Sequence, residues 1–151
     1  MTEPVIRRSF FKTMLAGVAG LGGALAASKA QAAAPKQKVA YHLADADKVA
    51  FVLGNIRNHI EGVGGPQNVE IALVVHGPAL KAFHEMNANE KIKEAVAGLH
   101  KDGLALNACG NTMRAQTVDL KDLLPGFVKA DQGGVVRLAE LQQQGYLYLR
   151  P

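Results

Sequence analysis

Short apolar runs recur along the chain and predict the strands of a sheet. The runs 38–43 (KVAYHL), 68–77 (NVEIALVVHG) and 104–108 (LALNA) are nearly continuous in their apolar character. Such runs are typical of strands that are covered on both faces of a parallel sheet. Two shorter runs, 127–130 and 146–149 (YLYL), predict a fourth and a last strand.

Between these runs, apolar residues recur at helical spacing. A helix is predicted over 46–61, capped by Asp45 and ended by Gly62 as its left-handed residue. Its apolar face consists of Val49, Val52, Leu53, Ile56 and Ile60. Pro78 is expected in the first turn of a short helix that carries Leu80, Phe83 and Met86.

The second half of the chain repeats the pattern. Asn89 is predicted to cap a helix that Gly103 stops, a short helical piece follows Cys109, and 133–145 (GGVVRLAELQQQG) is a final helix. Strands that alternate with helices indicate an α/β fold with a mainly parallel sheet. The length of the chain favours a single domain.

The first 32 residues have the pattern of an export signal. Arg7 and Arg8 precede an apolar, Gly-diluted stretch, and 30–32 (AQA) is a small-residue cleavage site. The paired arginines predict the twin-arginine route and a periplasmic protein. The alternative is a retained anchor, but the apolar stretch is shorter than the roughly 20 residues of a spanning helix. We therefore expect a signal over 1–32, a domain over 33–151, and no membrane association after cleavage.

Removal of the signal changes the charge of the protein. The whole chain has a formal charge of +4, and the segment 1–32 contains four of the basic residues and one of the acidic residues. The predicted domain is therefore nearly neutral, at +1. With no basic cluster left, we expect no nucleic-acid partner.

Three predicted strands end at residues that could take part in chemistry. His42 lies at the end of the first strand, His76 at the end of the second, and Cys109 follows the third. Ligands bind outside the carboxyl ends of strands in open parallel sheets. The topology therefore allows these side chains to converge on one edge, although the spacing alone does not bring them together.

Cys109 is the single cysteine of the chain, so no disulfide can form within it. Gly110 permits a sharp turn, and Asn111 or Thr112 can cap the next helix. A thiol before a helix N-terminus is favoured as thiolate, and Arg114 could add positive charge. The opposing interpretation is a small, buried and inert cysteine. Both remain open from the pattern alone.

Several classes of function are disfavoured. Ser9 and Ser28 are the only serines and both lie in the predicted signal, which excludes a serine hydrolase. No glycine-rich phosphate loop follows a strand of the predicted domain, and no H-x-x-x-H, C-x-x-C or H-E-x-x-H spacing occurs. We therefore expect no cofactor and no resident metal. A weaker hypothesis is a soft-metal binder that uses Cys109 with His76 or His42.

Four motifs in order resemble the DsrE/DsrF-like family from about Lys38 to Pro151. They are the strand-end His-Gly-Pro of VVHGPAL, the turn ACGNT, LLPG, and the C-terminal pattern L-x-x-L-Q-x-x-G-Y-x-Y. The resemblance implies a five-stranded, mainly parallel sheet flanked by helices. It also implies homo-oligomers, often trimers or hexamers built from trimers.

The resemblance implies sulfur chemistry as well. In the better-understood relatives, a cysteine at the position of Cys109 carries sulfur as a persulfide in a relay. The hypothesis is a periplasmic carrier on Cys109, supported by His76 and Arg114, with unknown donor and acceptor proteins. Those relatives act in the cytoplasm, so the export signal puts the identity of these proteins in doubt. The alternative is a non-catalytic, homo-oligomeric binding module with an inert cysteine.

Overall fold

The structure is a computed structural model that describes residues 36–151, which form one sheet with helices on both faces. The strands are β1 (Gln37–Leu43), β2 (Val69–Val75), β3 (Ala105–Cys109), β4 (Phe127–Ala130) and β5 (Leu147–Leu149). Their order in the sheet is β4-β3-β2-β1-β5, and every neighbouring pair is parallel. The predicted α/β fold is confirmed. The predicted export signal, 1–32, lies outside the described residues.

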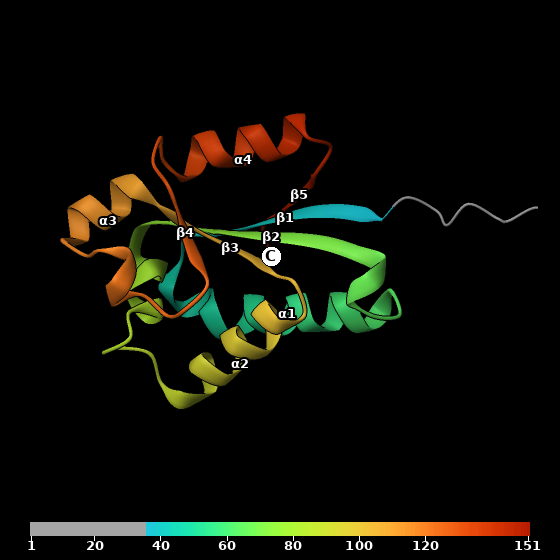
Figure 1. Cartoon of the computed structure of the whole chain (residues 1–151), viewed down its shortest axis with the longest axis horizontal. Coiled ribbons are helices and arrows are strands. Elements are labelled where there is room, and N and C mark those ends of the chain that lie inside the picture. The colour runs from blue at the N-terminus through green and yellow to red at the C-terminus, as the bar shows by residue number, and fades with distance from the viewer. Residues whose placement is uncertain (1–35) are drawn as a thin grey trace, which may run out of the picture. The chain divides into compact units, whose positions relative to one another are not determined.

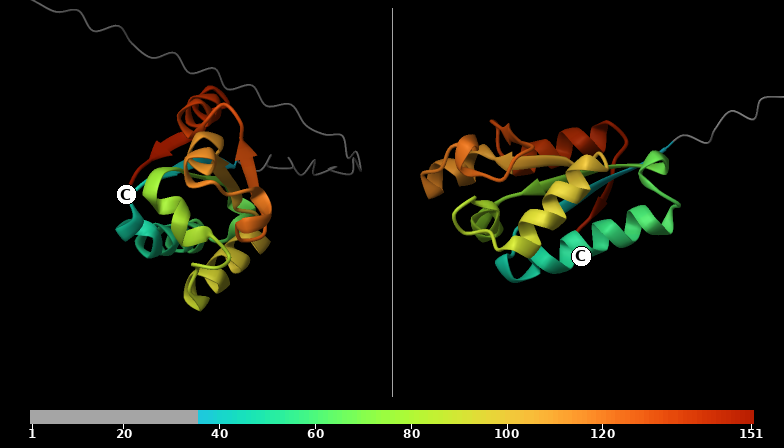
Figure 2. Two further views of the ribbon diagram at one scale, coloured as in Figure 1. Left: turned by 90° about the vertical axis from the view of Figure 1, so that its left-hand side faces the viewer. Right: turned by 60° about the horizontal axis from the view of Figure 1, so that its bottom comes forward.

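Four α-helices surround this sheet: α1 (Val49–Gly62), α2 (Glu90–Lys101), α3 (Gly110–Gln116) and α4 (Gly134–Gln143). Figure 1 shows α1 and α2 below the sheet, α4 above it, and α3 beyond the end of β3. The left panel of Figure 2 looks from the side of α3 toward the carboxyl ends of the strands. Four 3-10 helices complete the connections: Ala46–Lys48, Pro66–Asn68, Gly77–Phe83 and Leu120–Asp122.

The two faces of the sheet contribute to separate apolar cores because successive side chains of a strand point to opposite faces. The larger core lies on the side of α1 and α2. It includes Val39, Ile71, Leu73 and Leu106 from the strands and Phe83 from the Gly77–Phe83 helix. The smaller core lies under α4 and consists of Ala40, Ala72, Val74, Leu138 and Leu141.

Three local predictions in the first half of the chain are wrong. Asp45 makes no side-chain cap, because the chain first forms the 3-10 turn Ala46–Lys48 and the Asp45 carboxylate pairs with Arg150 instead. Gly62 is the last helical residue, and the positive φ angles occur at Gly64 and Gly65, at 85° and 117°. Met86 is 98% exposed, because the short helix ends at Phe83.

The predicted cap of α2 is confirmed. The Asn89 side chain accepts a hydrogen bond of 3.0 Å from the Ile92 backbone N–H, which satisfies one free donor of the first turn. Gly103, with a φ angle of 95°, follows the end of the helix and leads the chain into β3.

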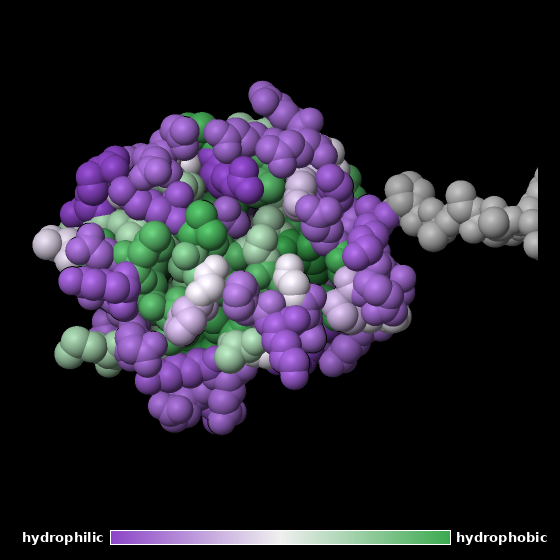
Figure 3. All heavy atoms as spheres, viewed as in Figure 1, coloured by the Kyte–Doolittle hydropathy of each residue, from purple (hydrophilic) through white to green (hydrophobic). Residues whose placement is uncertain are grey.

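Apolar side chains are also exposed on the surface. Figure 3 shows hydrophobic side chains in the middle of one face, between hydrophilic margins. Exposed apolar residues include Val128 on β4 and Val135 and Val136 on α4. Within residues 36–151, no helix has the length and apolar character needed to cross a membrane.

Candidate functional site

The carboxyl ends of β1, β2 and β3 bring the three predicted residues to one edge of the sheet. Val75 pairs with Ala108, so the next residues along the two strands, His76 and Cys109, lie side by side. His42 pairs with Val74, so it lies two residues before the level of His76. By the alternation of side chains, all three belong to the face that α4 covers. The three side chains therefore lie at one edge of the sheet, as the topology allowed.

The Cys109 sulfur is buried and surrounded by hydrogen-bond donors. The side chain is 5% exposed, and Cys109 is the N-cap residue of α3. Burial raises the pKa of the thiol, but hydrogen bonds from the Thr112 hydroxyl and from the backbone N–H groups of Thr112, Gly134 and Asn111 lower it. The balance leaves the pKa below its ordinary value, which favours the thiolate.

Thr112 is itself held in place by the loop after β2. The Gly77 backbone N–H donates to the Thr112 hydroxyl oxygen at 2.9 Å, which leaves the hydroxyl proton free to point at sulfur. The Gln116 side chain donates to the Gly77 carbonyl at 2.9 Å and fixes the same loop from α3. The donor at the thiol is therefore positioned by the His-Gly-Pro segment.

Three buried glycines let the backbone close around the thiol. A Cβ atom on Gly134 would lie 3.2 Å from Cys109 Cβ and 3.4 Å from His76 Cβ. A Cβ atom on Gly110 would lie 2.9 Å from the Ala130 carbonyl oxygen, and one on Gly133 would lie 2.6 Å from the Asn111 amide nitrogen. Because these positions lack side chains, the first residue of α4 reaches the sulfur with its N–H group.

The two strand-end histidines contact each other. The Nε2 atoms of His42 and His76 are in hydrogen-bond contact, and His42 Nδ1 lies 2.6 Å from the Tyr148 hydroxyl oxygen. Burial, His76 and Arg150 lower the pKa of His42 to about 4, although Asp45 raises it. Burial, followed by Arg150, also lowers the pKa of His76. Both rings are therefore neutral near pH 7.

The remaining predicted residues have different roles from those expected. Neither Asn111 nor Thr112 caps α3, because the helix already begins at Gly110. Both instead donate to Cys109. Arg114 is exposed, and its guanidinium donates to the Asn111 side-chain oxygen. Arg114 therefore holds the side chain of Asn111 at the start of α3.

The structure adds residues that the sequence patterns did not single out. Asn107 is buried two residues before Cys109 and accepts a hydrogen bond of 3.0 Å from Arg137 Nε, which ties α4 to β3. Its amide group donates to the Leu73 and Ala105 carbonyl oxygens. The sequence offered two signals for these features. One is a polar residue within the apolar run LALNA, and the other is the Gly-Gly pair before the last helix. Tyr148 is the last residue of the C-terminal family pattern, but its contact with His42 depends on the pairing of β5 with β1.

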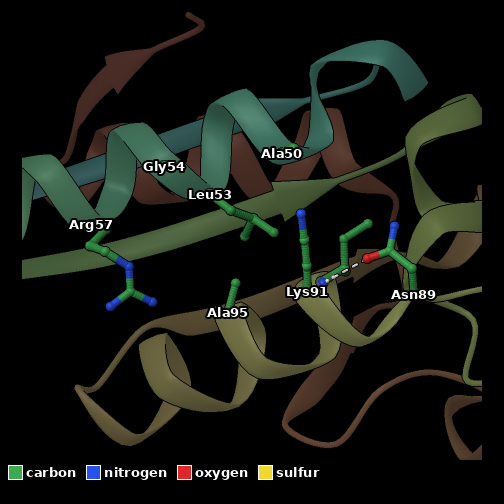
Figure 4. A pocket seen from close by; sticks show the side chains of 8 residues that line it. Ala50, Leu53, Gly54, Arg57, Asn89, Lys91 and Ala95 are labelled. Carbon is green, nitrogen blue, oxygen red and sulfur yellow. Dashed lines mark hydrogen bonds between the residues drawn. The ribbon is translucent and has the colours of Figure 1, made fainter.

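A groove between α1 and α2 is separate from this edge. Its volume is about 300 Å³. Its lining residues are Ala50, Leu53, Gly54, Arg57, Asn89, Lys91, Ile92 and Ala95. Figure 4 shows the side chains of Arg57 on α1 and Lys91 on α2 at this groove. It contains neither the thiol nor a histidine, so the candidate site is the strand-end edge.

Comparisons with known proteins agree with this architecture. The family described as DsrE/DsrF-like matches residues 24–151. This match begins before the predicted domain boundary at residue 33. A solved structure titled as a protein of unknown function, MTH1491, from Methanobacterium thermoautotrophicum is 27% identical, with a TM-score of 0.67. The alignment covers 77% of this chain and all of that one.

A second solved structure supports the fold alone. The ychN protein from E. coli is 15% identical, with a TM-score of 0.57, over 77% of this chain and 99% of that one. The search of curated proteins found no match.

Proposed function

The chain belongs to the DsrE/DsrF-like family, and from this membership and the strand-end edge we propose that it carries sulfane sulfur as a persulfide on Cys109. The sulfur is received from a donor and passed to a partner protein. The observation that carries the proposal is the set of hydrogen-bond donors from Thr112, Asn111 and Gly134 that surrounds the Cys109 sulfur. These donors favour the nucleophilic thiolate and suit a bound anionic sulfur.

The chemistry consists of two exchange steps. The Cys109 thiolate attacks the outer sulfur of a donor persulfide, R–S–SH, which forms Cys109–S–SH and releases the thiolate R–S⁻. An acceptor thiolate then attacks the outer sulfur of Cys109–S–SH and regenerates the Cys109 thiolate. Each step forms one sulfur–sulfur bond and breaks another, so no external oxidant or reductant is needed.

Mass spectrometry of protein treated with polysulfide tests this proposal. We expect the intact mass to increase by one sulfur atom, and treatment with a reducing thiol to reverse the increase. Cys109→Ser removes the only thiol of the chain, so this variant should show no increase. An increase that survives in Cys109→Ser refutes the assignment to Cys109, and no increase in the wild type refutes the persulfide.

Thiol titration distinguishes a carrier from a binding module with an inert cysteine. The lowered pKa supports reaction of native Cys109 with a small reagent such as iodoacetamide at neutral pH. The thiol is 5% exposed, so this reaction requires local opening around α3 or α4. A Cys109 that reacts only after denaturation favours the inert alternative.

The proposed carrier is exported by the twin-arginine route and acts in the periplasm as a homo-oligomer. The twin-arginine motif supports the first part, and Arg7→Lys with Arg8→Lys should retain the protein in the cytoplasm, as cell fractionation would show. The exposed Val128, Val135 and Val136 support assembly, because an interface between copies would remove these apolar side chains from water. Light scattering should give the mass of a trimer or a hexamer.

A further inference from the structure

The rings of His42 and His76 face each other end to end. Their planes are 18° apart, their centroids are separated by 4.7 Å, and the Nε2 atoms are in contact. In-plane lone pairs on the two nitrogens are therefore directed at one another. Such a pair either shares a proton or holds a cation between the nitrogens.

The two rings are supported differently. Tyr148 contacts His42 Nδ1 at 2.6 Å and so sets the orientation of that ring. Within residues 36–151, His42 is the one hydrogen-bond partner of the His76 ring. A ligand histidine held at its second nitrogen is the usual arrangement in metal sites. His76, held at one nitrogen, is the ring that can turn to admit an ion.

The number of nearby donors restricts the metal. In the described part of the chain, no three His, Cys, Asp or Glu side chains are grouped to hold a metal ion. Zinc sites use three or four protein ligands, and calcium and magnesium use oxygen ligands. Monovalent copper has a filled d shell and is stable with two ligands in a line, and imidazole is a good copper ligand.

We propose that His42 and His76 bind one monovalent copper ion in a linear site beside Cys109. The site does not depend on persulfide chemistry. The two Nε2 atoms already face each other without the thiol, so the site is assigned to the two rings, and Cys109→Ser tests this assignment directly. The nearest cation, Arg150, is paired with Asp45 at 3.1 Å, which reduces its repulsion of a bound ion.

An anaerobic titration of the untagged protein with Cu(I) against a chromogenic chelator tests the site. We expect one ion per chain in the wild type. His42→Gln and His76→Gln should each weaken binding by at least about 100-fold, since even residues that support a ligand contribute 10–100-fold. By the same principle, Tyr148→Phe should weaken it by roughly tenfold.

The chain offers two matched controls. His59 also contacts a tyrosine, with His59 Nδ1 at 2.9 Å from the Tyr41 hydroxyl, so His59→Gln should leave copper binding unchanged. Cys109→Ser should also bind one ion. Loss of binding in Cys109→Ser assigns the copper to the thiol and overturns the proposal. Full binding by His42→Gln or His76→Gln overturns it as well.

Two measurements on the wild type avoid any dependence on the folding of a variant. X-ray absorption should show two nitrogen neighbours in line, and a sulfur neighbour contradicts the site. Nitrogen NMR should show shifts at the His42 and His76 rings on addition of Cu(I), with His59 unchanged. Persulfide loading of the histidine variants is measured in parallel, so that a failed copper site is distinguished from a failed sulfur carrier.

Discussion

The two faces of the sheet are built from the same strands but carry different kinds of side chain. Val39, Tyr41 and Leu43 of β1 point toward α1 and α2, where they join the larger apolar core. Between them, Ala40 and His42 point toward α4. A shift of one residue along the strand thus separates the packed face from the face that carries the site.

The difference teaches where stability and chemistry are located. The face under α1 and α2 buries large apolar side chains along its whole length. The α4 face has a core of only five buried residues in the described part of the chain, and beyond it lie Cys109, His42 and His76. We therefore expect substitutions on the first face to change folding and substitutions on the second to change reactivity.

The largest effect should come from Phe83→Ala on the packed face. Phe83 is fully buried and meets Phe127 edge to face, with the ring centroids 5.3 Å apart. Removal of a buried Phe side chain costs about 3–5 kcal/mol, because it leaves a cavity. Denaturant unfolding should show this loss, and Phe51→Ala, at a 55% exposed position of α1, should change stability by less than about 0.5 kcal/mol. Equal losses would contradict the assignment of Phe83 to the core.

Asn107→Ala should give the next largest effect and tests whether the α4 face also contributes to stability. The substitution removes the acceptor of the partly exposed Arg137 Nε and the amide donor to the Leu73 and Ala105 carbonyl oxygens, and each such hydrogen bond contributes about 0.5–1.5 kcal/mol. Because Arg137 ties α4 to β3, the Gly134 N–H should also move away from sulfur, and the pH midpoint of iodoacetamide labelling of Cys109 should move upward. Asn58→Ala, at an exposed position of α1, is the control. An unchanged midpoint would show that Asn107 does not support the thiol.

Much of this arrangement follows from local patterns. The apolar runs that predict β1, β2 and β3 also place His42, His76 and Cys109 at their carboxyl ends, so the sheet edge could be predicted before any contact was known. The cap at Asn89 was equally local, because its acceptor serves an N–H three residues later in the same chain segment.

The error at Asp45 and the missed contacts arise where distant segments meet. Asp45 has the residue type of a cap, yet its carboxylate pairs with Arg150, which β5 brings to the same edge. Tyr148 reaches His42 by the same pairing, and Gly134 reaches Cys109 from the helix that follows β4. Strand order decides these contacts, and spacing along the chain does not encode it.

Thr112→Val tests the donor at the thiol through its pH dependence. A hydrogen bond to a charged group contributes about 1.5 kcal/mol or more, so labelling of Cys109 at neutral pH should slow by roughly tenfold. The midpoint of the rate against pH should move upward, whereas Thr112→Ser, which keeps the hydroxyl, should resemble the wild type. An unchanged midpoint in Thr112→Val would show that the backbone N–H groups alone set the pKa of the thiol.

The same substitution has a consequence for stability. The folded-state pKa of Cys109 is depressed, so the ionised thiol stabilises the fold at pH values above the unfolded-state pKa. This contribution is lost as the pH falls through the folded-state pKa. The difference in unfolding free energy between wild type and Thr112→Val should therefore shrink with decreasing pH, and a difference that grows would contradict the sign of the shift.

The smallest effect compares one glycine from each side of the sheet. A Cβ atom on Gly54, within α1, meets nothing within 4 Å, so Gly54→Ala should stabilise the protein by about 0.5–1 kcal/mol through reduced freedom of the unfolded chain. Gly134→Ala also reduces the freedom of the unfolded chain. Its added Cβ atom, however, must displace Cys109 Cβ and His76 Cβ, which lie 3.2 and 3.4 Å from it. We expect the two variants to differ by about 1 kcal/mol in denaturant unfolding, since this displacement cancels the gain. Only Gly134→Ala should also move the pH midpoint of Cys109 labelling upward, because it displaces the Gly134 N–H from the sulfur. If both variants were equally stabilised and labelling were unchanged, the close approach of α4 to the thiol would have no role in the site.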